Sequence, residues 1–320
     1  MTTTTRPIGI YYEHPDWFRP LFAELDRRGT PWVRLDAARH RYDASNGDGA
    51  EFGLVFNRMS PSAHLRGHGH SILYTLNYLA HLEQLGTRVV NGVSAFRIET
   101  SKALQLALLK RLGLPFPPSR VINHASQAPA AAEGLRFPVV VKANIGGSGA
   151  GIVRFDLAED LERAVSEDRV DLGLDQTALV QEFIPARGGH ITRVEVLGDR
   201  YLYGIKVYST GESFNLCPAD ICQTSDGVEL SRSGCAADAP KNNLRVEAFT
   251  PPNDAIVDVE RIMTTAGIEV GGVEYIVDDR DGQRYYYDIN ALSNFVADAP
   301  RVVGFDPFAR LGAFLETEVR

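Results

Sequence analysis

The chain has 320 residues, of which 44% are hydrophobic and 23% charged, an ordinary composition for a soluble globular protein with room for two or three packed units. Its formal net charge of −8 leaves no large basic field, which argues against general binding to nucleic acids or to membrane surfaces. No apolar run approaches the length of a membrane span, and the first residues lack the basic and apolar regions of a signal peptide, so we expect a cytoplasmic protein.

The first part of the chain alternates short apolar strands with helical stretches. Strands are expected at residues 8–12, 31–35 and 53–56, and a helix at residues 16–28. This alternation is typical of an α/β unit built on a mainly parallel sheet. We therefore predict an N-terminal α/β domain over residues 1–98.

The second part begins with a strong helix signal at residues 101–113. The segment is rich in Ala and Leu, carries Lys110 and Arg111 near its C-terminal end and stops at Gly113. A buried strand, a glycine-rich loop, a strand, an acidic amphipathic helix and another strand are expected after it, at residues 137–142, 146–151, 152–155, 157–168 and 178–184. We predict that residues 99–186 form a second domain.

The third part is predicted to contain two hairpins, separated by an irregular stretch at residues 209–250 and a helix. The expected strands and helices lie at residues 191–197, 201–208, 254–266, 272–278, 284–290 and 306–318. The irregular stretch holds three cysteines: Cys217, Cys222 and Cys235. They are too few for a disulfide framework, and without Cys-x-x-Cys spacing ordinary buried thiols are favoured over structural zinc. The third domain is expected at residues 187–320.

Two tyrosine-rich strands of the second hairpin gather acidic residues on one face. With Asp278 opposite Arg284, Glu274 would face Asp288, and Asn290 would share their side of the sheet. The other face would be a continuous core stripe of Val273, Tyr275, Val277, Tyr285, Tyr287 and Ile289. Two carboxylates and an amide oxygen are hard donors that suit Mg²⁺. The alternative is an ordinary solvated strand face.

The glycine-rich loop is a candidate phosphate site, because backbone N–H groups can converge there on an anion without side-chain obstruction. Its candidate contacts are Gly147, Ser148, Gly149 and Gly151. The loop lacks the Gly-Lys-Ser/Thr of a P-loop and leads into a strand, which fits a cover that closes over phosphates. Lys142 ends the strand before it, and Lys102 opposes the dipole at a helix N-terminus, so a bound phosphate would explain both lysines. The alternative is a flexible hairpin turn.

Residues 181–184 are a candidate adenine site. An extended strand offers backbone N–H and C=O groups to a base edge, and Phe183 and Ile184 can supply apolar contact. Glu182, next to Gln181, can accept a hydrogen bond from the amino group or the ribose. A plain edge strand is the alternative.

Taken in chain order, these features resemble the ATP-grasp superfamily, and most of all its branch of glutathione synthetase and the RimK-like amino-acid ligases. The features are Lys102, Lys142 with the glycine loop, residues 181–184, Arg193, Lys206, and lastly Glu274, Asp288 and Asn290. The resemblance covers nearly the whole chain. It implies an N-terminal α/β domain followed by two α+β subdomains that hold ATP between them. It also implies phosphate contacts for the two lysines, a mobile lid for the glycine loop and magnesium ligation by the last three residues.

Two departures from the family pattern concern the substrates. Many relatives continue Asn-x-Ser-Pro-Gly after the metal-binding asparagine, whereas this chain reads Asn-Ala-Leu-Ser-Asn-Phe from Asn290 to Phe295. His190 and Ile191 fall where the family has a ribose-side acid. ATP binding remains expected, while the ribose contacts and the acceptor substrate stay open.

The resemblance implies an ATP-dependent carboxylate–amine ligase. A carboxylate attacks the γ-phosphate of ATP to give an acylphosphate and ADP, and an amine then displaces phosphate. Two Mg²⁺ ions are expected, with Mn²⁺ as an alternative ion. Arg193, Lys206 and Arg232 are the candidate catalytic residues. Lys206 would add positive charge, and Arg193 would stabilise the transferring phosphoryl group or the tetrahedral intermediate, unless it is a surface ion pair.

Two other functions remain alternatives on the same scaffold. A phosphotransferase would stop at phosphate transfer, and a non-catalytic protein would only bind the nucleotide. Retention of both lysines and all three metal-site residues weighs against the non-catalytic alternative. The expected partners are a small-molecule carboxylate and an amine, the latter an amino acid or a peptide, and the oligomeric state stays open, with a homo-oligomer as one option.

The substrate site is expected at the carboxyl end of a strand in the N-terminal domain, where α/β sheets bind ligands. Arg58 is the candidate for a bidentate contact to a substrate carboxylate, with Ser60 beside it, and Arg232 is a second candidate for that contact. Five further residues could line an acceptor pocket: His14, Trp17, His64, His68 and His70. A metal site made of the last three is disfavoured, because no carboxylate partner is evident nearby.

Overall fold

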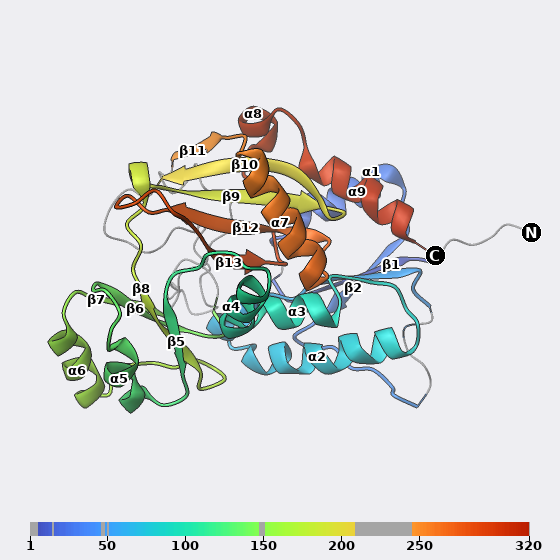
Figure 1. Ribbon diagram of the computed structural model, residues 1–320. Coiled ribbons are helices and arrows are strands. Elements are labelled where there is room, and N and C mark those ends of the chain that lie inside the picture. The colour runs from blue at the N-terminus through green and yellow to red at the C-terminus, as the bar shows by residue number, and fades with distance from the viewer. Residues whose placement is uncertain are drawn as a thin grey trace, which may run out of the picture.

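The computed structural model describes residues 6–14, 16–45, 49, 51–146, 151–208 and 245–319 (Figure 1). In this part of the chain the strands form three sheets, two with four strands and one with five. Several predicted residues lie outside the described ranges: Gly147, Ser148, Gly149, Cys217, Cys222, Arg232 and Cys235.

The first sheet is parallel, as predicted, with strand order β2-β1-β3-β4. Its strands are β1 (Ile8–Tyr12), β2 (Trp32–Asp36), β3 (Leu54–Arg58) and β4 (Val89–Val90). The helical elements around it are α1 (Arg19–Arg28), η1 (Pro61–Arg66), α2 (Gly69–Gln84) and α3 (Val93–Glu99). Helix α2 was not predicted, and its start carries no side-chain cap that would signal a helix N-terminus.

The second sheet is antiparallel, with strand order β5-β8-β6-β7. Its strands are β5 (Ser119–Ile122), β6 (Val139–Ala143), β7 (Ile152–Phe155) and β8 (Ala178–Glu182). Helix α4 (Lys102–Arg111) precedes the sheet, and η2 (Ala125–Gln127), α5 (Ala128–Ala132) and α6 (Ala158–Ser166) follow its strands. Figure 1 shows α5 and α6 side by side at the outer end of this unit. Their apolar side chains form a core with one face of the sheet.

The third sheet has strand order β11-β10-β9-β12-β13 and is antiparallel throughout. Its strands are β9 (His190–Leu197), β10 (Arg200–Tyr208), β11 (Arg245–Ala248), β12 (Val270–Val277) and β13 (Arg284–Asn290), and η3 (Arg187–Gly189) leads into it. Helix α7 (Asn253–Ala266) packs on one face, over Val194, Val196 and Val273. The opposite face carries Ile191 and Ile205, which belong to a core shared with β1 and β3 of the first sheet.

The chain end returns to the first sheet. Helix α8 (Ala299–Val303) is followed by α9 (Pro307–Glu318), which lies beside α1 (Figure 1). Leu311 and Leu315 of α9 share a core with Leu21 and Leu25 of α1. The first and third sheets are therefore held together from both ends of the sequence.

The predicted pairing of the last hairpin is partly confirmed. Glu274 lies opposite Asp288, but Tyr275 lies opposite Tyr286, so Tyr287 is an extra residue in β13. This bulge turns Tyr286 into the core and directs the Tyr287 hydroxyl to the acidic face, where it donates to Glu274. The predicted core stripe was therefore wrong at Tyr285 and Tyr287. Arg284 pairs with Val277 instead of Asp278 for the same reason.

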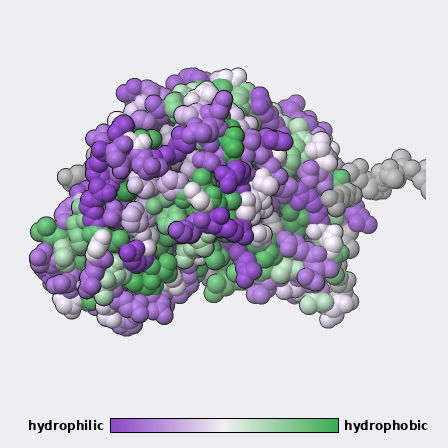
Figure 2. Space-filling model, in the orientation of Figure 1, coloured by the Kyte–Doolittle hydropathy of each residue, from purple (hydrophilic) through white to green (hydrophobic). Residues whose placement is uncertain are grey.

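The described part of the chain contains no helix long and apolar enough to cross a bilayer. The face of the molecule seen in Figure 2 is mostly hydrophilic, with hydrophobic side chains scattered among charged ones.

Candidate active site

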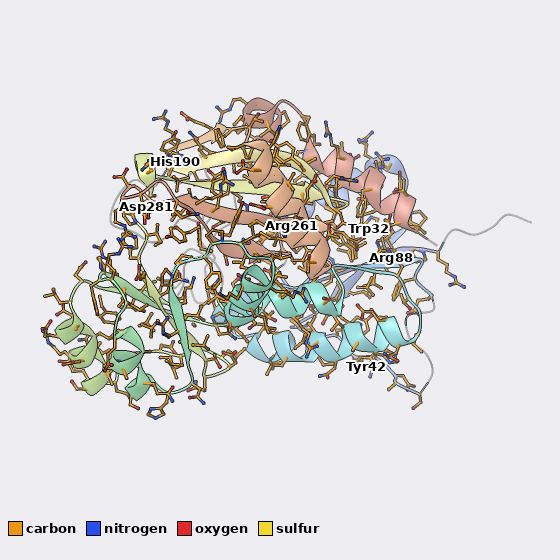
Figure 3. All side chains as sticks on the ribbon, in the orientation of Figure 1. Trp32, Tyr42, Arg88, His190, Arg261 and Asp281 are labelled. Carbon is orange, nitrogen blue, oxygen red and sulfur yellow. The ribbon has the colours of Figure 1, made fainter. Side chains whose placement is uncertain are left out.

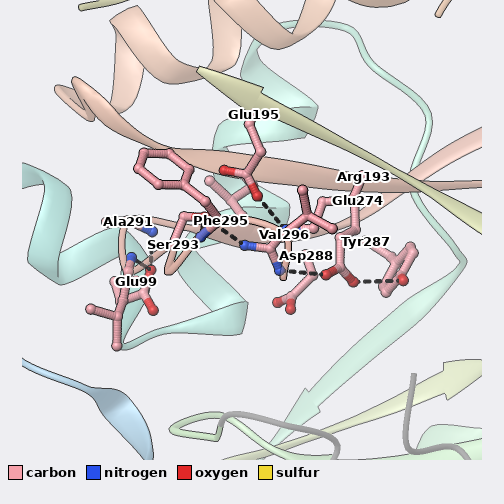
Figure 4. A network of polar contacts seen from close by, with 12 residues as sticks. Glu99, Arg193, Glu195, Glu274, Tyr287, Asp288, Ala291, Ser293, Phe295 and Val296 are labelled. Atoms are coloured by element: carbon pink, nitrogen blue, oxygen red, sulfur yellow. Dashed lines mark hydrogen bonds and ion pairs between the residues drawn. The ribbon is translucent and has the colours of Figure 1, made fainter. Parts of the chain in front are cut away.

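The two carboxylates of the metal prediction each contact a cation in the structure, and Figure 4 shows the contact of Glu274 with Arg193. Lys102, at the start of α4, donates from Nζ to Oδ1 of Asp288 at 2.6 Å. Arg193, on β9, donates from Nη1 to Oε1 of Glu274 at 3.0 Å, and the Tyr287 hydroxyl donates to Oε2 of Glu274 at 2.7 Å. Helix α4 and strands β9, β12 and β13 thus place two acids and two bases in one cluster.

Arg193 is buried within this cluster, with 8% of its side chain exposed, so it is not a surface ion pair. Its Nε donates to Oε1 of the fully buried Glu195 at 2.6 Å, and its Nη2 donates to Oγ of Ser293 at 3.3 Å. Glu195 fits because the strand beside it carries Gly272, where a Cβ would lie 2.9 Å from Oε2 of Glu195. The guanidinium of Arg193 is therefore fixed in orientation by three separate acceptors.

Burial and charge act in opposite directions on these carboxyl groups. Burial raises the pKa of Glu274, the charge of Asp288 adds to that increase, and Arg193 opposes it. Burial would also raise the pKa of Asp288, but the positive charges of Lys102, Lys142 and Arg193 outweigh it and hold this pKa below its usual value. Two adjacent carboxyl groups with pKa values displaced in opposite directions are typical of a functional site.

Asn290 completes the donor set. It lies opposite Gly272 at the end of β13, on the same face as Asp288. Its buried Nδ2 has no hydrogen-bond partner among the described residues. Two carboxylates and an amide on one rigid sheet face suit a magnesium ion. Because Nδ2 of Asn290 is unpartnered, a ligand bound at this face would determine the orientation of the amide.

Lys142 reaches the cluster from the second sheet. It lies on the face of β6 opposite the α5–α6 core and is 5% exposed. Burial, and to a smaller extent the nearby charge of Lys102, lower the pKa of its ammonium group to about 7, although Asp288 and Glu274 oppose this shift. No described residue accepts a hydrogen bond from this ammonium group. A buried cation of this kind is suited to an anionic ligand.

The predicted adenine segment divides between the two faces of the second sheet. Gln181 lies on the Lys142 side and donates from Nε2 to Oγ of Ser119 at 2.7 Å. Glu182 lies on the core side, where Oε1 accepts from the Arg136 backbone N–H at 2.9 Å. Its carboxylate therefore does not point into the space expected for the nucleotide, which corrects the predicted side-chain contact. The strand continues beyond β8 to Phe183 and Ile184.

Phe183 lies beside Arg154 on the Lys142 side of the second sheet. The guanidinium of Arg154 lies 4.7 Å from the ring centroid of Phe183, a cation–π arrangement on the side of the sheet that carries Lys142. The backbone N–H of Ile184 has no acceptor among the described residues. Gly151, the only predicted loop contact in the described ranges, has a φ of +72°.

Lys206 does not join the charged cluster. It pairs with Thr192 across β9 and β10, whereas Arg193 pairs with Ile205. Neighbouring residues of a strand point to opposite faces, so Lys206 lies on the α7 side of the sheet. Its ammonium group lies 4.5 Å from the ring centroid of Phe249. The prediction that Lys206 adds positive charge at the site was therefore wrong.

Arg58 forms its hydrogen bonds with other residues of the protein. It is 2% exposed at the end of β3 and donates to the carbonyl oxygens of Ala291 and Ser293 and to Oδ1 of Asn294. These contacts hold the segment that departs from the family pattern, so the structure gives Arg58 a role other than anchoring a substrate carboxylate. Ser60, also predicted to contact substrate, caps η1, where its Oγ accepts from the backbone N–H of Ser62 at 3.1 Å.

Sequence reasoning missed the other side chains that hold residues 289–296. Their shared feature is a buried polar group bonded to the backbone of this segment: Asn91, Glu99, Gln105 and Tyr203. Burial raises the pKa of Glu99 to about 7, although its hydrogen bond from Ala291 opposes that rise. Asn91 has a left-handed φ of 55°, and its side chain joins β4 to Val270 and Ala291. No local pattern marks these residues, because their partners lie more than 90 positions away.

The histidines of the N-terminal unit form a different contact. His68 donates from Nδ1 to Oε1 of the buried Glu13 at 2.6 Å, and Arg66 donates to the same carboxylate at 3.0 Å. The expectation that no carboxylate lies near these histidines was therefore wrong. His14 stacks on Trp17 with ring centroids 4.1 Å apart, and burial lowers its pKa to about 4. Among the described residues no group of three His, Cys, Asp or Glu side chains is placed to hold a metal ion.

Comparison with known proteins identifies the family. Residues 99–216 match the model of the RimK-like ATP-grasp domain. A probable alpha-L-glutamate ligase of Haemophilus influenzae (strain PittEE) is 32% identical over 233 residues, which is 68% of this chain and 72% of that protein. The chain belongs to the RimK-like ATP-grasp family.

Solved structures of ATP-grasp proteins share the fold over nearly the full length. The RimK domain ATP-grasp protein from Sphaerobacter thermophilus DSM 20745 superposes with a TM-score of 0.66 at 20% identity, covering 96% of this chain and 98% of that one. The ligase PsnB, in a complex with a phosphomimetic precursor variant, Mg and ADP, superposes with a TM-score of 0.68 at 18% identity, covering 99% and 100%. The predicted fold, an α/β unit followed by a two-subdomain ATP-grasp fold, is confirmed.

The chain spans only part of the length of other proteins that it matches. It covers 21% of the carbamoyl phosphate synthase large chain of Rubrobacter xylanophilus and 42% of a probable alpha-L-glutamate ligase of Pasteurella multocida. The activity of these longer proteins can therefore only be proposed for this chain.

Proposed function

We propose that this protein is an ATP-dependent carboxylate–amine ligase that works through an acylphosphate and releases ADP and phosphate. The observation that carries the proposal is the convergence of Lys102 and Lys142 with Glu274, Asp288 and Arg193 in one buried cluster. We also propose domain boundaries at residues 1–98, 99–186 and 187–320, which separate the three sheets.

ATP and Mg²⁺ are the proposed ligands of this cluster. Glu274, Asp288 and Asn290 would hold the metal, and two ions, with Mn²⁺ as a substitute, are part of the proposal. Metal bound there would neutralise charge on the phosphate oxygens. Support comes from the donor set and from the PsnB structure, which was determined with Mg and ADP. Lys142 and Lys102 would contact the phosphates, and Phe183 and Ile184 would contact the base.

The side chains of the cluster meet the demands of the proposed reaction. When the substrate carboxylate attacks the γ-phosphorus, the bond to the β–γ bridging oxygen breaks and ADP leaves. The amine then attacks the acyl carbon, loses a proton and expels phosphate. Arg193 would stabilise the negative charge that develops in either step, because Glu195 and Ser293 hold its guanidinium in place before reaction.

Product analysis tests this proposal. The protein would be incubated with ATP, Mg²⁺, pooled carboxylates and pooled amines that include amino acids and short peptides. We expect ADP and phosphate release that depends on the amine, and hydroxylamine should trap the acylphosphate as a hydroxamate. AMP release would contradict the acylphosphate route. A stable phosphorylated product would indicate a phosphotransferase, and nucleotide binding without turnover would indicate a non-catalytic protein.

The lowered pKa of Lys142 predicts a pH dependence of nucleotide affinity. With its pKa at about 7, the amine of the free protein loses its proton as the pH rises above 7, and phosphate binding should restore that proton. The affinity for MgADP should therefore fall between pH 7.5 and 9, by up to about tenfold per pH unit. Calorimetry in buffers of different ionisation enthalpy should detect proton uptake on binding.

Lys142→Arg is the matched variant for this measurement, because a guanidinium stays charged over the whole range. We expect its MgADP affinity to be flat between pH 7.5 and 9, without the proton uptake of the wild type. Equal pH profiles for the two proteins would show that Lys142 does not titrate at the nucleotide site.

A further inference from the structure

We infer that Lys102 and a divalent cation compete for Asp288, so that nucleotide phosphate strengthens metal binding by drawing Lys102 away from this carboxylate. The inference rests on the proposed function and adds a specific role for one ion pair. It treats Lys102 as an exchangeable counter-ion of a metal ligand as well as a phosphate contact.

The Lys102–Asp288 ion pair lies at the proposed metal site. Lys102 Nζ lies 2.6 Å from Oδ1 of Asp288, and 13% and 22% of the two side chains are exposed. A metal ion that takes Asp288 as a ligand must displace this ammonium group or share the carboxylate with it. Since a carboxylate paired with a cation attracts a second cation less, Lys102 weakens the metal site for as long as it stays there.

The backbone of Lys102 is fixed at the start of α4, while its side chain is long enough to turn. Ser101 caps helix α4, and Asn144 binds the helix start through its backbone carbonyl to the Lys102 N–H at 3.2 Å and through Oδ1 to the Ala103 N–H at 2.9 Å. Asn144 follows Lys142 by two residues, so the two lysines are tied to each other. The long, flexible side chain of Lys102 can then swing from Asp288 to a phosphate held near Lys142.

Lys102 and Arg193 differ in the number of acceptors that hold them. Arg193 also pairs with a metal ligand, Glu274, but Glu195 and Ser293 hold it in addition. Among the described residues, Asp288 is the acceptor of the Lys102 ammonium group. If Arg193 lost its contact with Glu274, its two other acceptors would still hold the guanidinium in place. Lys102, in contrast, can leave Asp288 when another anion accepts its ammonium group. We therefore expect a divalent cation to exchange with the Lys102 ammonium group at Asp288.

Binding of Mn²⁺, followed by the electron paramagnetic resonance signal of the free ion, tests the inference without turnover. Wild-type protein should bind Mn²⁺ weakly alone, and ADP should tighten that binding by about tenfold or more. Lys102→Met should bind Mn²⁺ alone about tenfold more tightly than wild type, and ADP should add little. Lys110→Met, which removes an exposed lysine from the same helix, should behave as wild type.

The outcomes separate the inference from the proposed function. If wild type binds Mn²⁺ with ADP but Lys102→Met binds Mn²⁺ alone no better than wild type, the inference is overturned and the proposed function stands. If wild type does not bind Mn²⁺ even with ADP, both are overturned. Thermal melting should show that the variants are folded. Lys102→Gln, which keeps a hydrogen-bond donor for Asp288, replaces Lys102→Met in the comparison if the methionine variant does not fold.

Discussion

Asp288→Asn should lower kcat/KM for ADP formation by at least about 10³-fold, equivalent to about 4 kcal/mol of transition-state stabilisation. The change keeps the shape of the side chain and a hydrogen-bond acceptor for Lys102, but it removes the negative charge at the proposed metal site. The loss should appear in ADP release measured as a function of ATP concentration at saturating Mg²⁺. Metal-free ADP binding should survive, because the lysines remain.

Asp281→Asn is the matched control for that variant. Asp281 is an exposed residue in the turn of the same hairpin, and Figure 3 places it at the tip, where its side chain accepts from the Gln283 backbone N–H at 2.8 Å. It should leave turnover within about twofold of wild type, as expected for a surface substitution. An Asp288→Asn protein that kept more than about a tenth of wild-type activity would remove the metal assignment.

Arg193→Lys should reduce kcat by about 10² to 10³-fold while changing the MgADP affinity by less than about threefold. A lysine retains a positive charge between Glu195 and Glu274, but it cannot donate in three fixed directions as the guanidinium does. The separation of kcat from nucleotide affinity would show that Arg193 acts on the transition state and not on ATP binding. Steady-state kinetics and calorimetric MgADP titration would measure the two quantities.

The lysine variant is preferable to methionine, because Arg193→Met would leave two buried carboxylates without a counter-charge and should cost about 3–5 kcal/mol of folding stability. Arg200→Lys, at the exposed start of β10, is the control for a conservative change of an arginine in the same sheet. A kcat for Arg193→Lys within about threefold of wild type would show that the proposed role of Arg193 is wrong.

Features that depend on local sequence were predicted well. The alternation of apolar and polar residues located β12 and β13, and the same alternation placed Glu274, Asp288 and Asn290 on one face. Helix α4 was predicted from its composition and from Gly113 after its end. In each of these cases the signal and the structure lie within one or two elements.

Predictions failed where one residue of register decides the outcome. The extra Tyr287 in β13 exchanged core and site positions of three tyrosines, because each shift by one residue reverses the face of a side chain. Glu182 was assigned to the site from its place in an extended strand and Lys206 from chain order, yet each points from its strand to the opposite face. Chain order locates a strand near a site, but pairing with neighbouring strands decides which of its residues faces inward.

Local sequence signals specify which segments form strands and helices, the order of the units and the group of metal-site residues on one hairpin, since these follow from periodicity, capping and turn residues close together in the chain. The pairing of the charges depends instead on tertiary packing. Lys102 meets Asp288 across 186 positions, and Arg58 meets Asn294 across 236. Such contacts arise when separate sheets pack, and burial then makes each unpaired polar group costly, so the pairing depends on the whole fold and on no local pattern.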